Sequence, residues 1–118
     1  MPTLTIAGTV QFPLASEANP PSTSFSSSVN YTERNVDDVD FSGAVNDIDL
    51  MGRITDAKAC FIQMLIGEGT LKINGSTDET PVATSGNGFW VWVNPVGGLT
   101  ALTITTAAAA RVRVFMFT

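Results

Sequence analysis

The most constraining feature of this sequence is a series of short apolar runs in its last thirty residues. Within each run, apolar residues alternate with polar ones or follow one another without a break. Glycine, asparagine and proline separate the runs, and these residues favour tight turns, so the pattern predicts β-strands joined by turns. The three runs are Phe89–Val93, Leu102–Ile104 and Arg111–Phe117.

Two of these runs are apolar on both faces. Every residue of Phe89–Val93 is apolar, and Phe115 and Phe117 lie on the opposite face of their run from Val114 and Met116. A strand that is apolar on both faces of an antiparallel sandwich needs a further layer outside it. We therefore expect a β-domain that assembles with other subunits, with Phe115 and Phe117 at the contact.

The length of 118 residues predicts one domain, spanning residues 1–118. The regular spacing of strand and turn signals predicts an all-β fold, a single antiparallel β-sandwich with about eight strands, jelly-roll-like and without a substantial helix. Residues 48–54 suggest a strand interrupted at Gly52. Residues 57–66 could place three apolar side chains on one face of a helix, but the run leads directly into Gly67 and a second apolar run, which favours a strand.

Composition excludes several kinds of chemistry. The chain has no histidine, which rules out Ser-His-Asp and Cys-His catalysis and ordinary zinc sites. The single cysteine, Cys60, cannot form an intrachain disulfide and lies in an apolar run typical of a core. Six scattered lysines and arginines in a chain of net charge −5 do not form a phosphate-binding surface. We therefore expect no enzyme activity, no cofactor and no nucleic-acid partner.

An acidic cluster is the only candidate for a metal site. It contains Asp37, Asp38, Asp40, Asp47 and Asp49. Carboxylates at short spacing are suitable Ca²⁺ ligands, but this spacing matches no calcium-loop motif. We expect no metal, and interpret the charges as solvated strand faces that discourage unwanted edge pairing.

Residues 13–23 form a proline-bearing connection without periodicity, which is long for a compact domain. It is either a surface loop or an arm that lies on an adjacent subunit. In the second case Leu14, Pro20 and Pro21 would contact the neighbour. Only 14% of the residues are charged, against about 25% in an average protein. Such a surface suits a protein whose faces pack against neighbours.

Trp90 and Trp92 project from the same side of one strand. Three interpretations remain open for them: core residues, anchors of a subunit contact, or a platform on which sugar rings stack.

The segment 59–118 resembles the small β-structural proteins of tailed bacteriophage virions, which decorate capsids or serve as tail and baseplate subunits. The resemblance is carried by Ile66–Asn74 (IGEGTLKIN), Gly88–Pro95 (GFWVWVNP), Gly97–Thr105 (GGLTALTIT) and Arg111–Val114 (RVRV). It implies a jelly-roll or related sandwich, several copies per particle and no cofactor.

These observations favour a non-enzymatic structural virion protein, most simply a capsid decoration or cement subunit that packs on the shell and on its own copies. The expected partners are its own copies, as a trimer or other homo-oligomer, and the major capsid or another virion protein, without a membrane. The start of the sequence shows no secretion signal, so we expect synthesis in the host cytoplasm and residence in the virion. The alternatives are a tail, fibre or baseplate component that binds a host surface glycan, and a stand-alone carbohydrate-binding β-module.

Overall fold

The computed structural model describes residues 1–12, 14, 18–85 and 88–118, and every helix or strand in them is a β-strand paired antiparallel. The all-β prediction is therefore confirmed. The ten strands are β1 (Thr3–Gln11), β2 (Ser22–Asn30), β3 (Arg34–Phe41), β4 (Val45–Asp49), β5 (Ala59–Ile66), β6 (Glu68–Ile73), β7 (Thr80–Ala83), β8 (Phe89–Val93), β9 (Leu102–Thr106) and β10 (Ala110–Phe117).

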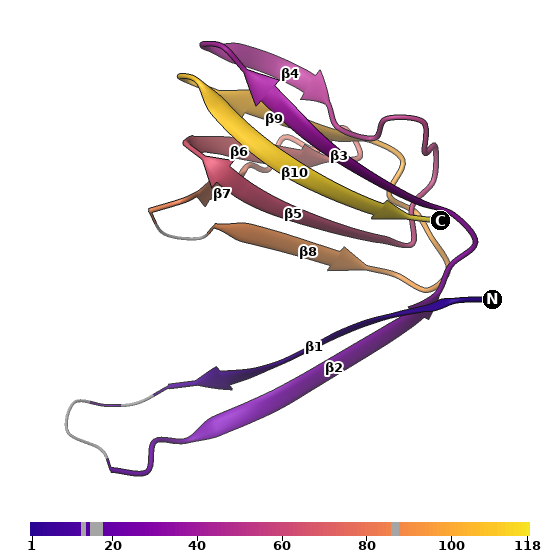
Figure 1. Cartoon of the computed structure of the whole chain (residues 1–118), viewed down its shortest axis with the longest axis vertical. Coiled ribbons are helices and arrows are strands. Elements are labelled where there is room, and N and C mark those ends of the chain that lie inside the picture. The colour runs from indigo at the N-terminus through magenta and orange to yellow at the C-terminus, as the bar shows by residue number, and fades with distance from the viewer. Residues whose placement is uncertain (13, 15–17, 86–87) are drawn as a thin grey trace.

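Eight of these strands form two four-stranded sheets, in the orders β3-β10-β5-β8 and β4-β9-β6-β7. The two sheets face each other in a sandwich-like arrangement (Figure 1) and share one hydrophobic core. Ile62, Val112 and Met116 reach this core from the first sheet, and Leu71 and Ile104 reach it from the second, all with an exposed fraction of 1% or less.

The alternation of side chains along β10 determines which of them are buried between the two sheets. Its even-numbered residues Val112, Val114 and Met116 are buried in the shared core, while Arg111 and Arg113 lie on the outer face of the sheet. Successive side chains of a strand point to opposite faces, so Phe115 and Phe117 share that outer face with the arginines. The strand lies between β3 and β5 and pairs with both.

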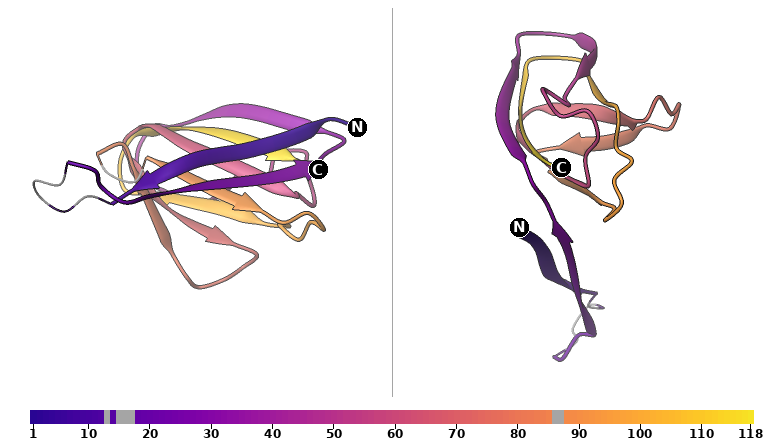
Figure 2. Two further views of the ribbon diagram at one scale, coloured as in Figure 1. Left: turned by 90° about the horizontal axis from the view of Figure 1, so that it is seen from below. Right: turned by 90° about the vertical axis from the view of Figure 1, so that its right-hand side faces the viewer.

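The first two strands form a separate two-stranded hairpin, which extends away from the sandwich (Figures 1 and 2). The radius of gyration is 15.8 Å, whereas a compact chain of this length would have about 13.5 Å. Only the base of the hairpin is joined to the sandwich, through a second small hydrophobic cluster around Val29, Ala59 and Phe117. That residues 1–118 form a single domain stays a prediction.

Three details differ from the sequence prediction. The described residues contain ten strands, not about eight. The expected strand over 48–54 ends at Asp49, and the buried residues Leu50, Met51 and Ile54 follow it in a turn. The connection at 13–23 is the tip of the β1–β2 hairpin, with β2 beginning at Ser22; residues 13 and 15–17 of this connection lie outside the described residues.

Candidate functional site

Three phenylalanines form an aromatic patch on the outer face of the β3-β10-β5-β8 sheet. Phe61 of β5 lies between the other two, with its ring centroid 6.2 Å from that of Phe89 and 5.5 Å from that of Phe115. Phe61 and Phe115 are direct cross-strand partners, so the pairing register brings them together. Phe89 is 57% exposed at the edge of the sheet. The aromatic patch (Phe61, Phe89 and Phe115) is an apolar surface that the sandwich itself does not cover.

The β1–β2 hairpin is amphipathic, and its polar face is a row of hydroxyl groups. Cross-strand pairs on this face interact through their side chains, with O···O distances of 2.8 Å for Thr3 and Asn30, and 3.2 Å for Thr5 and Ser28. Alternate residues turn the apolar side chains to the opposite face. This apolar hairpin face carries Leu4, Ile6, Val10, Phe25 and Val29 beside the small residues Gly8, Thr23 and Ser27, and Phe12 continues the alternation after β1.

Gly8 leaves room for the Phe25 ring near the middle of this apolar face. Gly8 is the cross-strand partner of Phe25, and the Phe25 ring lies across the glycine. A Cβ atom at position 8 would come within 2.8 Å of Phe25 Cζ, closer than real Cβ contacts allow. An aromatic ring that covers a cross-strand glycine is a known stabilising pair in β-sheets.

The apolar hairpin face is covered at its base and exposed toward its tip. At the base, Val29 packs with Phe117, and Leu4 lies against this pair. A groove of about 350 Å³ separates the hairpin from the sheet and is lined by residues 4–7 on one side and by Phe61, Phe115 and Phe117 on the other. Figures 1 and 2 show the hairpin diverging from the sheet beyond this point. Val10, Phe12 and Phe25 are each about half exposed there.

The residues predicted at a subunit contact have different surroundings. Phe117 is only 8% exposed, because the base of the hairpin and the Tyr31 ring, 5.0 Å away between centroids, cover it within the chain. Phe115 is partly buried in the same cluster. At the hairpin tip, Leu14 and Pro21 are exposed and Pro20 is half-buried. The contact itself stays a prediction. Val10, Phe12 and Phe25, which the sequence analysis did not select, are further exposed apolar residues toward the tip of the hairpin.

Trp90 and Trp92 lie on the inner side of β8 and pack against the shared core. Their cross-strand partners are the fully buried Ile62 and Cys60. This placement favours the core interpretation over the sugar-stacking one. Trp90 also lines a pocket of about 370 Å³ together with polar side chains of the β6–β7 connection, among them Asn74.

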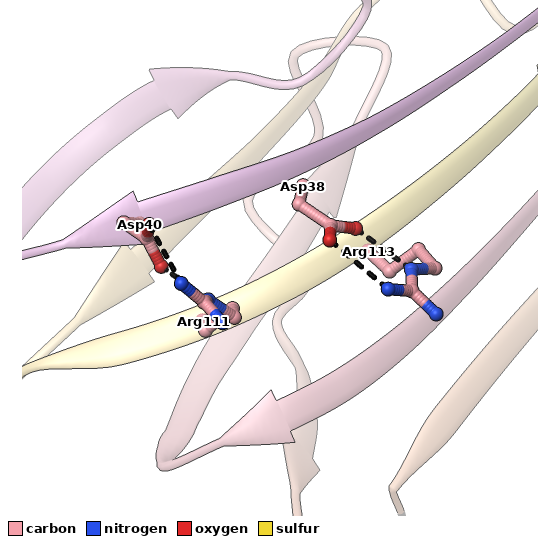
Figure 3. Close-up of polar contacts among 4 residues, drawn as sticks. All are labelled: Asp38, Asp40, Arg111 and Arg113. Atoms are coloured by element: carbon pink, nitrogen blue, oxygen red, sulfur yellow. Dashed lines mark hydrogen bonds and ion pairs between the residues drawn. The ribbon is translucent and has the colours of Figure 1, made fainter.

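Two acid–arginine pairs stand beside the aromatic patch on the outer face (Figure 3). The Asp38 carboxylate accepts hydrogen bonds from Arg113 Nε at 2.7 Å and Nη2 at 3.0 Å, and Asp40 accepts from Arg111 Nε at 2.6 Å and Nη2 at 3.2 Å. Each arginine's hydrogen bonds and charge lower the pKa of its carboxyl partner. Equal spacing of two aspartates and two arginines was a readable signal for this ladder, which the sequence analysis missed.

The remaining candidate chemistry is limited. Among the described residues, no three histidine, cysteine, aspartate or glutamate side chains are grouped so that they could hold a metal ion. Burial raises the pKa of the Cys60 thiol to about 12, so the sulfur stays protonated and unreactive at neutral pH.

The acid–arginine ladder predicts a pH-dependent contribution to stability. A carboxyl group whose pKa is lowered by folding stabilises the protein above its unfolded-state pKa of about 3.9, and this contribution disappears as the pH falls through the lowered folded-state value. We expect Asp38→Asn/Asp40→Asn to lower the midpoint of thermal unfolding at pH 7 but to match the unmodified protein at the acid end of the scan. Asp78→Asn, an exposed aspartate without an arginine partner among the described residues, is the control. A difference that persists unchanged down to pH 2 would contradict this account.

No helix in the described ranges is long and apolar enough to cross a membrane. Comparison of this chain with protein-family models, with curated proteins and with solved structures finds no match.

Proposed function

We propose that this protein is a non-enzymatic structural subunit of a tailed-phage virion, a decoration or cement protein that packs on the capsid shell and on its own copies. One observation carries the proposal: an amphipathic hairpin extends from the sandwich with its apolar face uncovered toward the tip. The resemblance of residues 59–118 to phage virion proteins supports the particular kind of assembly.

We further propose that β3–β10 form a jelly roll, an eight-stranded double-sheet fold that is common among viral capsid proteins. The strand pairs support this because they are nested along the chain: β3 with β10, β4 with β9, β5 with β8 and β6 with β7. A chain that folds back on itself at the β6–β7 connection forms one long antiparallel ribbon. Rolling up that ribbon produces this nesting. The β1–β2 hairpin would then be an arm added before the jelly roll.

The surface chemistry also supports a subunit that is held by many weak contacts. The hydroxyl face of the hairpin can remain in water while the apolar face is covered by another molecule. On a shell that presents many equivalent positions, linked contacts of modest individual affinity add up to stable attachment. Such a protein needs neither a cofactor nor a reactive side chain.

Sedimentation with phage shells tests the proposal. The purified protein should pellet with assembled empty shells of its phage and should not bind unassembled coat subunits. Val10→Ser/Phe25→Ser, which makes the hairpin tip polar, should leave most of the protein in the supernatant. Val96→Ser, at a loop residue that is 87% exposed, should pellet like the unmodified protein. A protein that stays in the supernatant under all conditions would contradict the proposal.

A glycan-binding tail, fibre or baseplate component, or a stand-alone carbohydrate-binding module, is the second candidate. It is favoured by the pocket that Trp90 lines with polar side chains. However, Asn74, one of these side chains, is already engaged: its amide oxygen accepts the backbone N–H groups of Thr100 and Ala101, and its amide nitrogen donates to the Gly98 carbonyl. The shell experiment separates the two candidates, because glycan binding gives no reason for the protein to pellet with shells.

A further inference from the structure

The exposed apolar part of the β1–β2 hairpin would be stabilised by packing against another surface. A two-stranded ribbon without a third strand or a packed face is at best marginally stable in water. In the described part of the chain the hairpin has no third strand, and it packs on the sandwich only at its base. Toward the tip, Val10, Phe12 and Phe25 project from the apolar face of the hairpin, and about half of the surface of each residue is exposed. A surface that receives its apolar face would therefore stabilise the hairpin.

The base of the hairpin shows which kind of surface fits. There, Val29 and Leu4 pack on Phe117 and beside Phe115, on the outer face of the β3-β10-β5-β8 sheet. The aromatic patch is the continuation of that same face, and Phe89 at its far end is exposed. Within one chain the hairpin diverges from the sheet, so its own tip does not cover its own patch (Figures 1 and 2).

We infer that the hairpin tip of one subunit packs on the aromatic patch of a second copy of this chain. The inference deepens the proposed self-association and rests on it. Each copy carries a hairpin tip with exposed apolar side chains and a patch whose far end, Phe89, is exposed, so two copies related by a two-fold axis can cover each other reciprocally. The contact would extend, between chains, the packing already present at the hairpin base.

Charge is compatible with this contact. Strands β1 and β2 contain no charged residue. On the receiving face, Asp38 and Asp40 are neutralised in direct pairs by Arg113 and Arg111, and Arg34, the exposed register partner of Phe117, is a further charge. Two uncharged strands can approach the paired part of this surface without leaving an unpaired charge buried, which would be the main electrostatic cost of a dry contact.

The area is sufficient for a stable pair. Val10, Phe12, Phe25 and Phe89 are each about half exposed, and so is Val36, the cross-strand partner of Phe115 on the outer face. Together they leave on the order of 400 Å² of apolar surface uncovered per chain. Reciprocal contact of two chains would bury about 800 Å², and apolar atoms make up about 60% of an interface. The total is then roughly 1,300 Å², within the range of about 1,200–2,000 Å² for specific complexes.

Cysteine cross-linking between differently labelled chains tests the inference. One preparation carries Val10→Cys and another carries Phe89→Cys; the native Cys60 is fully buried and does not compete. After mixing and mild oxidation, we expect the mixed disulfide between the two preparations to exceed the statistical share of about half of all cross-linked pairs. Ile48→Cys, at an exposed position on β4 of the other sheet, replaces Phe89→Cys in the control and should give at least tenfold less mixed product.

Every other outcome overturns the inference. A Val10→Cys/Phe89→Cys double variant that cross-links within single chains would mean that the hairpin closes on its own sheet. Predominant pairing of Val10→Cys with itself would mean that hairpins pack on hairpins. Absence of cross-links, with a monomer in analytical ultracentrifugation, would leave the hairpin for another virion protein.

A second measurement does not depend on disulfide geometry. Val10→Ser/Phe89→Ser, on exposed side chains of the two faces, should weaken self-association at least tenfold in sedimentation equilibrium while circular dichroism stays unchanged; unaltered association would contradict the inference. Both tests use the purified protein alone, so they can fail while shell binding remains, and shell binding can fail while they succeed.

Discussion

Replacing Ile62 with alanine is expected to lower the free energy of unfolding by about 2–5 kcal/mol. Ile62 lies on the inner side of β5 and is fully buried in the core that the two sheets share. Alanine removes apolar contacts and leaves a cavity between the sheets, because the surrounding strands can relax only in part. A domain of this size is stable by about 5–15 kcal/mol in total, so urea unfolding should show a large shift of the midpoint.

Phe61→Ala is the matched comparison for Ile62→Ala. Phe61 is the preceding residue of the same strand, but it lies on the outer face, where it contacts Phe89 and Phe115. Losing these ring contacts should cost the monomer about 1 kcal/mol. The same variant should weaken self-association, whereas Ile62→Ala should affect association only through unfolding. Equal losses of stability in the two variants would contradict the division of β5 into a core face and a contact face.

Gly67→Ala should also destabilise the protein strongly, by about 2–5 kcal/mol. Gly67 connects β5 to β6, where the chain crosses between the two sheets, and its φ of 82° is unfavourable for any residue with a side chain. A Cβ atom there would lie 2.9 Å from the Ala109 carbonyl oxygen and 3.1 Å from Ala110 Cβ. Backbone strain of about 1–2 kcal/mol and overpacking of about 1–3 kcal/mol combine at this position.

Gly75→Ala separates these two contributions. Gly75 has a similar φ of 71°, but an added Cβ atom would meet nothing within 4 Å. This variant should therefore lose only the strain contribution, and its thermal midpoint should fall less than that of Gly67→Ala. The Gly67 variant is expected to shift by about 10 °C. Equal shifts would show that steric contact at the sheet crossing is unimportant.

Local pattern predicted much of the fold. The runs at 89–93 and 111–117 are strands as expected, and the ambiguous segment 57–66 contains β5. Alternation also predicted correctly that Phe115 and Phe117 lie on the opposite face from Val114 and Met116. These features depend on side-chain periodicity within one strand, which the sequence displays directly.

Features that depend on distant parts of the chain were not predictable in the same way. Strand β7 was missed because Thr80–Ala83 is short and contains a proline, and it is a strand because it pairs with β6. Leu50, Met51 and Ile54 read as part of a strand because they are apolar, but they are buried in a turn instead. Their burial is set by the packing around them.

The same distinction between local features and contacts of distant segments applies to the candidate site. The aromatic composition of the outer face was readable, but the covering of Phe117 by Val29 and Tyr31 requires contacts across more than eighty residues of sequence. The connection at 13–23, predicted as either a surface loop or an arm, joins the two strands of a longer hairpin. The sequence shows that β1 and β2 are amphipathic, but it does not show that they lack a third partner strand.

The central position of β10 has a consequence for biosynthesis. This strand lies between β3 and β5 and pairs with both, so the sheet cannot form until β10 has been synthesised. For example, Arg34 of β3 pairs in register with Phe117 near the end of β10. Until residues 110–117 have left the ribosome, β3 and β5 lack the strand that pairs with both of them. Folding should therefore follow synthesis of this segment, at the slow rates of chains dominated by distant strand pairs. During that interval the nascent polypeptide exposes unpaired strand edges that can aggregate. The yield of folded protein should therefore depend on chaperones that bind these edges.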